Sequence, residues 1–273
     1  MRTTSLGQLL FALGFVIVGA IGLGSQDFVL SQQPVPKGIP NRELLAGLSG
    51  GVLLLAGAGV FIARAARLAA LVLSGFMTLW VLALHLPRVV AQPGIEVYWL
   101  GLGEVTTLAA GGWLIYCALA GRSDADSMAG RYAPTLEIAR TIFGLALIPI
   151  GISHFVYLQV AADMIPAWFP FHVPLTWISG VGHIAAGVAI IFGIIPRLAA
   201  TLEAVMESLF TLIVWGGAVI AMPTKREDWV NLFISTALTG AGWALAESYR
   251  AVPWTLARRG ALAPALSHPA KPP

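Results

Sequence analysis

The chain has 273 residues, of which 58% are hydrophobic and 11% are charged, and its mean hydropathy is +0.82. A soluble domain carries about 25% charged residues, so a soluble protein of this length could not bury so much apolar surface in one core. The composition predicts that most of the chain is solvated by lipid. A net charge of +3 without a basic run argues against a nucleic-acid partner, and the single cysteine excludes an internal disulfide and a cysteine-based zinc cluster.

Eight segments are apolar enough to be membrane-spanning helices, each of which needs about 20 mostly apolar residues. In chain order they cover 6–24, 44–62, 68–86, 98–119, 141–160, 175–195, 198–221 and 230–248. The predicted fold class is therefore an all-α integral membrane protein with eight transmembrane helices. The first segment follows a short basic stretch, "MRTTS", as in a signal peptide, but its match to an internal helix indicates that it is retained.

The second half of the chain repeats the first half at an offset of 130 residues. "LSGGVLLLAG" (48–57) aligns with "ISGVGHIAAG" (178–187), "RLAA" at 67–70 recurs at 197–200, and "AGGW" (110–113) aligns with "GAGW" (240–243). Because each copy has four helices, both copies run in the same direction, unlike the inverted repeats of many transporters. We expect two parallel tandem four-helix bundles, with the first repeat over 1–120, a cytoplasmic linker over 121–138, the second repeat over 139–249 and a disordered cytoplasmic tail over 250–273.

The distribution of Lys and Arg predicts the orientation in the membrane, because cytoplasmic loops carry an excess of these residues. Five of the 16 basic residues fall on one side, namely Lys37, Arg42, Arg88, Lys225 and Arg226, and the others fall on the side of the N-terminus. Both termini are therefore predicted to be cytoplasmic in a multi-pass plasma-membrane protein. The side that carries the five basic residues is called the predicted outer side below.

Several of these segments resemble a known family. The resemblance is carried by "GISHF" at the end of a first helix, the Pro-containing loop "IPAWFPFHVP", "SGVGHIAAG" and "RLAA". With these segments the chain resembles the DoxX-like family of bacterial membrane proteins, most clearly over 141–248. The family is typically a four-helix unit, so this chain resembles two units in tandem, with His183 where many members carry Glu. The resemblance implies a role in membrane redox chemistry, since members include a subunit of a thiosulfate:quinone oxidoreductase.

Ionisable residues inside the predicted spans are the candidate site residues, because a charge in the centre of a bilayer costs about 2.5–3.5 kcal/mol on insertion scales. One candidate cluster, called the first cluster, lies in the C-terminal repeat, where Glu203 and Glu207 are one helical turn apart. The second cluster lies in the N-terminal repeat. The first comprises His154, His183, Glu207 and Glu203, and the second comprises His85 and Glu104. The positions of the first repeat that align with the first cluster hold apolar or small residues, namely Gly22, Leu53, Met77 and Leu73. The scaffold therefore does not require the polar side chains of the cluster.

Three interpretations of His154, His183 and Glu207 follow from the residues. They are buried polar groups that satisfy one another, or they form a site for a small molecule such as a quinone headgroup, or they bind a metal or haem; a proton relay is a fourth use of the same groups. There is no HxxxH or ExxH spacing, so the sequence assigns no metal ligand and no catalytic residue.

The resemblance and the intramembrane polar residues together favour an accessory or quinone-reactive subunit of a membrane redox system. Its expected partners are the lipid bilayer, a quinone and a redox partner protein. The alternatives are a non-catalytic membrane scaffold that binds a partner protein and a small-solute transporter.

Overall fold

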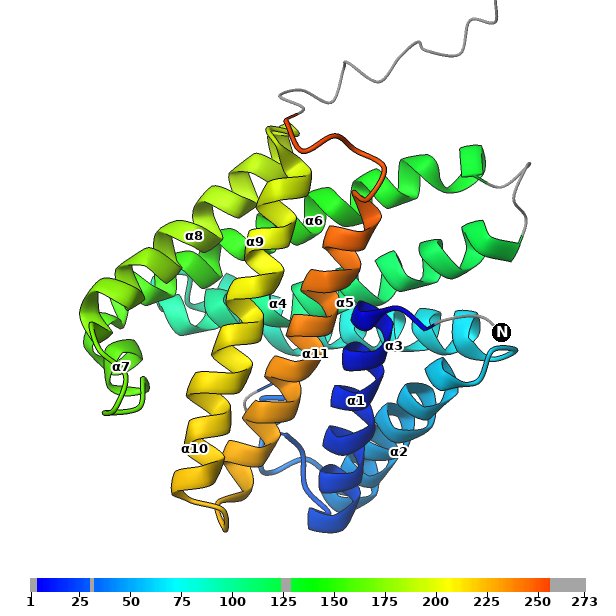
Figure 1. The fold of residues 1–273 in the computed structure, drawn as a ribbon. Helices are drawn as coiled ribbons and strands as arrows, with labels where there is room; N and C mark the ends of the chain where they lie inside the picture. Colours follow the sequence, from blue (N-terminus) through cyan, green and yellow to red (C-terminus); the bar gives the residue numbers. More distant parts are fainter. Residues whose placement is uncertain (1–3, 30–31, 124–128, 256–273) are drawn as a thin grey trace, which may run out of the picture.

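In the computed structural model, which describes residues 4–29, 32–123 and 129–255, the described chain is helical throughout apart from turns and loops, and it contains no β-strand (Figure 1). The elements in chain order are α1 (Leu6–Ser25), α2 (Arg42–Phe61), α3 (Ala66–Trp80), η1 (Val81–His85), α4 (Leu86–Ala91), α5 (Glu96–Ser123), α6 (Ala129–Val156), α7 (Leu158–Asp163), α8 (His172–Phe192), α9 (Pro196–Leu209), η2 (Phe210–Trp215), α10 (Gly216–Ala221) and α11 (Arg226–Ser248).

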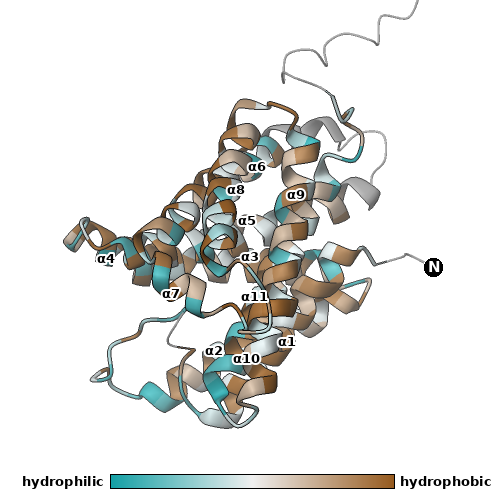
Figure 2. Ribbon diagram, turned by 60° about the vertical axis from the view of Figure 1, so that its left-hand side comes forward, coloured by the Kyte–Doolittle hydropathy of each residue, from teal (hydrophilic) through white to brown (hydrophobic). Residues whose placement is uncertain are grey.

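Eight helices of the described chain are long and apolar enough to cross a membrane, which confirms the predicted number of spans. They are Leu6–Ser25, Arg42–Phe61, Ala66–Ala91, Glu96–Ala120, Thr135–Val156, His172–Phe192, Pro196–Ala221 and Arg226–Ser248. Most of the helical ribbon has the colours of hydrophobic residues, whereas hydrophilic residues are most frequent in loops and at helix ends (Figure 2). The protein is therefore described as a multi-pass membrane protein.

Two predicted boundaries were wrong. The fifth span does not continue to residue 160, because Tyr157 leaves the helical conformation (φ −109°, ψ 36°) and the short helix α7 follows. The predicted surface linker over 121–138 is largely helical, since α5 continues to Ser123 and α6 begins at Ala129. A helix satisfies its own backbone hydrogen bonds and can therefore extend from lipid into water without a break. Residues 124–128 lie outside the described chain.

The beginning of the predicted disordered tail is packed against the helices. The Arg197 guanidinium donates a hydrogen bond of 3.1 Å to the carbonyl of Val252 and lies 4.0 Å from the centre of the Trp254 ring. These contacts fix residues 250–255 beside the start of α9. The rest of the predicted tail, 256–273, lies outside the described residues.

The two halves are interleaved and do not form two self-contained bundles. In Figure 1, α1 lies beside α11, and α5 lies beside α6. The first helix of each half thus packs on the last helix of the other half, and α1 makes little contact with α5. The sequence predicts two tandem four-helix bundles, but its pattern records only which residues are apolar and does not record which helices are in contact across the halves.

Close backbone contact at glycine holds this interleaved arrangement together. A Cβ on Gly240 would lie 2.2 Å from the amide nitrogen of Phe11, and a Cβ on Gly14 would lie 2.5 Å from the carbonyl oxygen of Phe233. Small residues allow such approach where lipid provides no hydrophobic driving force between helices. Gly7 meets Ala244 and accordingly lies near the end of α11, so α1 and α11 are antiparallel and their outer ends lie on the same side.

The third and seventh spans share an unusual local feature. Each is an α-helix interrupted by a π-helical segment, η1 in the third span and η2 in the seventh. A π-helical turn widens the helix locally and is often found at functional sites. The two segments carry His85 and Phe210 respectively, and both residues lie close to the cavity described below.

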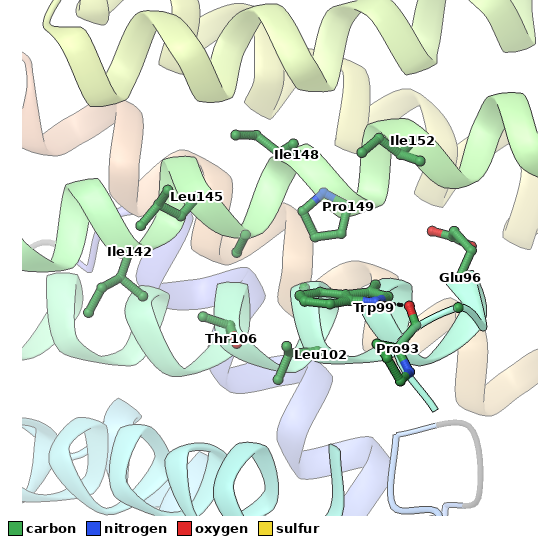
Figure 3. Close-up of a pocket in the computed structure, with 13 residues that line it drawn as sticks. Pro93, Glu96, Trp99, Leu102, Thr106, Ile142, Leu145, Ile148, Pro149 and Ile152 are labelled. Carbon is green, nitrogen blue, oxygen red and sulfur yellow. Dashed lines mark hydrogen bonds between the residues drawn. The ribbon is translucent and has the colours of Figure 1, made fainter. Parts of the chain in front are cut away.

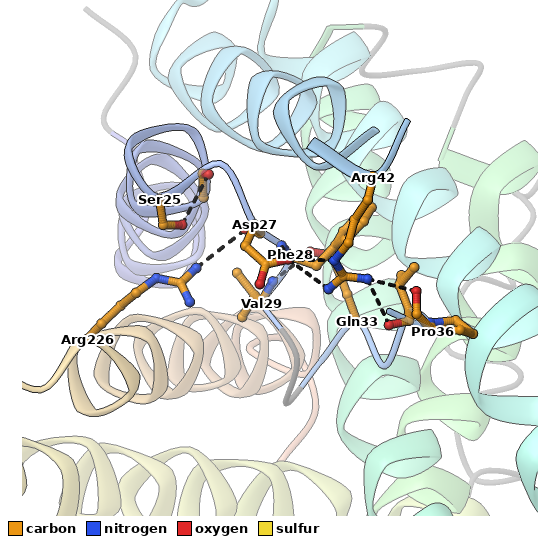
Figure 4. Close-up of polar contacts among 10 residues, drawn as sticks. Ser25, Asp27, Phe28, Val29, Gln33, Pro36, Arg42 and Arg226 are labelled. Carbon is orange, nitrogen blue, oxygen red and sulfur yellow. Dashed lines mark hydrogen bonds and ion pairs between the residues drawn. The ribbon is translucent and has the colours of Figure 1, made fainter. Parts of the chain in front are cut away.

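The loop between α1 and α2 is tied to both halves at the predicted outer side (Figure 4). Asp27 accepts hydrogen bonds of 3.0 and 2.7 Å from the Arg42 guanidinium, and its backbone carbonyl accepts one of 3.4 Å from Arg226 on α11. Burial by itself would raise the pKa of Asp27, but the Phe28 amide and the Arg42 guanidinium outweigh it and hold this pKa below its usual value.

The glycine contact predicts a position-specific loss of stability. Gly240→Ala should lower the free energy of unfolding by about 1–3 kcal/mol, because the new methyl group forces α1 away from α11. Gly75→Ala is the matched control: it is also a helical glycine, but a Cβ there meets nothing within 4 Å. Thermal unfolding of the purified protein in detergent measures both. Equal unfolding temperatures for the two variants would contradict the close contact.

The Asp27–Arg42 pair predicts a pH dependence. Because the pKa of Asp27 is lower in the folded protein than in the unfolded chain, the ionised carboxylate stabilises the fold above its unfolded pKa of about 3.9, and this contribution is lost as the pH falls through the folded pKa. Asp27→Asn should therefore unfold at a lower temperature than the parent protein at pH 7. The loss in free energy of unfolding should be below about 1 kcal/mol, because the carboxylate is partly exposed. The difference should shrink as the pH falls below the unfolded pKa and through the lower folded pKa. A difference that grows toward low pH would overturn the assignment.

Candidate functional site

A cavity of about 590 Å³ lies between the two halves, toward the predicted outer side. Its walls come from α5, α6, α7, α8, α9 with η2, and α11, and Gln32 of the α1–α2 loop closes part of it. This volume is within the range of small-molecule sites, about 300–1,000 Å³. The cavity is therefore large enough to hold the ring of an organic ligand.

Close packing of α6 on α8 brings two histidines together in this cavity. A Cβ on Gly151 would lie 2.7 Å from the carbonyl oxygen of Gly180, so only glycine permits this approach. As a result the ring centres of His154 and His183 are 5.2 Å apart. Phe210 lies against both rings, with centre-to-centre distances of 5.7 and 6.1 Å. The "GISHF" and "SGVGHI" sequences thus combine a glycine that allows contact with a histidine one turn away.

His183 is paired with a carboxylate in the interior. Its side chain and that of Glu203 are each 1% exposed, and His183 Nδ1 lies 2.8 Å from Glu203 Oε1. The second oxygen of Glu203, Oε2, is buried and has no hydrogen-bond partner among the described residues. Glu207 lies one helical turn further along α9 and also lines the cavity. One ligand atom from each of these three residues lies within 4.8 Å of the others.

The hydrogen bond that His154 makes to the backbone determines which of its ring nitrogens can accept a hydrogen bond from a ligand. Nδ1 lies 2.9 Å from the carbonyl oxygen of Ile150, one turn earlier in α6. Since a carbonyl accepts and never donates, Nδ1 carries the hydrogen in the neutral ring, and Nε2 is left as an acceptor. No hydrogen bond to Nε2 is formed by the described residues.

The second candidate cluster joins the first one through Gln32. The side-chain amide of Gln32 donates a hydrogen bond of 3.0 Å to Glu104, and the backbone carbonyl of Gln32 lies 2.8 Å from His85 Nε2. Glu104 lines the same cavity as His154, His183 and Glu207, whereas His85 lies behind Gln32 and does not line it. The sequence assigned the two clusters to separate halves, and the interleaved packing brings Glu104 of the second cluster to the cavity of the first.

Among the lining residues that sequence reasoning missed are Gln32, Tyr157, Phe210, Asn231 and Ser235. A loop glutamine and an aromatic residue in an apolar helix carry no periodic signal. Ser235 had a usable signal: it lies one turn before Thr239, and both hydroxyls are within 2.8 Å of the Thr211 hydroxyl. A row of hydroxyls on one face of an apolar helix indicates a buried polar contact.

The described lining of the cavity carries acidic groups and imidazoles but no permanent positive charge. Glu104 and Glu207 line it together with two imidazoles, and Glu203 lies behind His183, but the described lining includes no Lys or Arg. Three carboxyl groups without a permanent cation favour a ligand that donates hydrogen bonds or brings positive charge. An anionic ligand finds no counter-charge there.

A second groove, of about 670 Å³, lies between α5 and α6 on another face (Figure 3). It is mostly apolar, with Trp99, Leu145 and Pro149 along its length. Glu96 is at one end, and both of its carboxylate oxygens are buried without a partner among the described residues. The groove lacks a cluster of ionisable groups, and it is therefore not the candidate site.

Comparison with protein-family models, with curated proteins and with solved structures finds no match to this chain. The resemblance to DoxX-like proteins accordingly rests on the sequence motifs alone.

The buried His183–Glu203 pair predicts a compensating double substitution. Glu203→Leu should destabilise the protein by about 3 kcal/mol, because it leaves a buried imidazole without its partner. Adding His183→Leu should restore much of this loss, since the positions 130 residues earlier, Leu53 and Leu73, are buried leucines in the same protein. Thermal unfolding in detergent measures the series. A double variant no more stable than Glu203→Leu would show that the pair is not the energetic unit.

Proposed function

We propose that the protein binds a quinol headgroup in the cavity between its two halves and acts as a quinone-reactive subunit of a membrane redox system. The observation that carries the proposal is the combination of acceptor groups in one cavity of about 590 Å³ within apolar, span-length helices. A quinol is a lipid-soluble ligand with two hydroxyl donors and no negative charge. It therefore suits a site rich in carboxyl groups and poor in cations.

The geometry of the acceptors favours the reduced form of the ligand. His154 offers Nε2 as an acceptor because Nδ1 is occupied by Ile150, and Glu104 offers carboxylate oxygen from another helix lining the same cavity. A hydroxyl donates to such groups, whereas the carbonyl of a quinone does not. Phe210 and Trp215 add aromatic surface against which the ring of the ligand can pack.

Apolar residues at the rim of the cavity provide a path for a hydrocarbon tail. Val97, Val160 and Met164 line the cavity and are each exposed on the protein surface. Two of them flank or belong to α7, the short helix beside the cavity. A headgroup held inside the cavity could thus keep its isoprenoid tail in the surrounding lipid.

The same proposal includes a duplicated, DoxX-like architecture with both termini in the cytoplasm and a separate protein as the redox partner. Support for duplication comes from features that recur at the offset of 130: Trp99 and Trp229 donate 2.9 Å hydrogen bonds to Pro93 and Pro223 respectively. Gly111 packs against Ala241, its own counterpart, as residues beside a two-fold axis do. Left-handed backbone also recurs, at Asn41 and Phe171.

The quinol proposal predicts a selective loss of binding. His154→Phe keeps the ring packing but removes the acceptor, so the dissociation constant for a short-chain ubiquinol should rise about tenfold. The control is His172→Phe, because His172 bonds to Phe169 outside the cavity. Anaerobic titration by quenching of tryptophan fluorescence measures the affinity, with the matching ubiquinone as a second ligand. Absence of saturable binding, or an unchanged affinity in His154→Phe, would refute the proposal.

A further inference from the structure

We propose that His183, Glu203 and Glu207 bind a divalent transition-metal ion at the inner end of the cavity. One ligand atom from each residue lies within 4.8 Å of the other two, and His183 Nδ1 and Glu203 Oε1 are already 2.8 Å apart. An imidazole with two carboxylates is a ligand set that suits Mn²⁺, Fe²⁺ or Zn²⁺.

The hydrogen-bonding state of the two glutamates points to a missing positive partner. Glu203 Oε2 is buried in a side chain that is 1% exposed, and it has no hydrogen-bond partner among the described residues. Glu207 likewise has no side-chain hydrogen bond there, and its Thr211 contact is to the backbone carbonyl. A buried carboxylate oxygen without a partner is costly, and a bound cation would satisfy it.

Charge balance favours a divalent ion over a monovalent one. Two carboxylates and a neutral imidazole carry two negative charges, and the described cavity lining holds no Lys or Arg to neutralise them. A divalent cation makes the group neutral as a whole, which removes most of the cost of placing it in an apolar region. A single shared proton between His183 and Glu203 would leave Oε2 without a partner.

The distances require small adjustments of the side chains, including a slight opening of the 2.8 Å contact between His183 Nδ1 and Glu203 Oε1. Metal–ligand bonds of about 2.1 Å place neighbouring ligand atoms roughly 3–4 Å apart, slightly less than the 4.8 Å limit. Glu207 has no side-chain hydrogen bond to break, so rotation of its carboxylate can close this difference. Further coordination positions would face the cavity, where water can occupy them.

The ligands come from two helices, which explains why the sequence showed no metal motif. His183 is on α8 and the two glutamates are on α9, and His183 and Glu203 are 20 positions apart in the sequence. No local spacing rule relates residues on two different helices. The inference does not depend on quinol binding, because it rests on the ligand set and not on His154 or Glu104.

The experiment measures Mn²⁺ binding to the full-length protein, purified in detergent without a polyhistidine tag and stripped with a chelator. Electron paramagnetic resonance of free Mn²⁺ gives the stoichiometry and affinity, with Zn²⁺ as a competitor. We expect one ion per chain, displaced by Zn²⁺, and an affinity at least tenfold weaker in Glu207→Gln and in Glu203→Gln.

Two controls separate a ligand set from a general excess of negative charge. Glu104→Gln removes a carboxylate from the same cavity but not from the triad, and Glu43→Gln removes one from the exposed first turn of α2. Glu104→Gln should weaken binding less than either triad variant, because it removes a nearby charge but no ligand atom, and Glu43→Gln should keep parental affinity. Equal weakening by Glu104→Gln and Glu207→Gln, or no saturable binding of either ion to the parent protein, would overturn the proposal.

Folding is checked independently of binding. Mn²⁺ should raise the unfolding temperature of the parent protein and should leave that of the folded His183→Leu/Glu203→Leu double variant unchanged, because an ion stabilises only a state that binds it. An equal rise in both proteins would contradict the site. The quinol titration uses different residues and a different ligand, so either proposal can fail while the other stands.

Discussion

Close contact between helix backbones is the constraint on which the rest of this structure depends. In lipid, apolar surface gains little by leaving the solvent, so helices associate where small residues allow tight packing. Gly240 against Phe11 joins the first and last helices, and Gly151 against Gly180 joins α6 to α8. The first contact produces the interleaved arrangement of the halves. The second places two histidines beside one cavity.

Polar groups are concentrated on one side of an otherwise apolar framework. His183 and Glu203 are buried, and the positions 130 residues before them hold Leu53 and Leu73, which are buried as well. The same type of helix contact therefore forms with leucines or with a hydrogen-bonded His–Glu pair. Since a buried polar pair is often no more stable than packed apolar residues, and Glu203 Oε2 lacks a partner among the described residues, a ligand explains these groups better than folding does.

The two proposed ligands would occupy different parts of the same cavity. The quinol proposal uses His154 and Glu104, which lie on α6 and α5, and the metal proposal uses α8 and α9. The rings of His154 and His183, whose centres are 5.2 Å apart, connect the two regions. An ion at His183 would reduce the negative charge near the headgroup, and it would leave the Nε2 acceptor of His154 unchanged.

The sequence alone determined that lipid is the main solvent, the number of spans and the identity of the histidines and glutamates in the candidate site. These follow from composition and from helical periodicity, which depend on neighbours along the chain. The tertiary structure decided which helices are partners, and hence that Glu104 from the first half meets His183 and Glu207 from the second. It also brought in Gln32, a loop residue with no periodic signal. Helix pairing depends on how complementary surfaces fit in three dimensions, and no residue pattern within one helix encodes its partner.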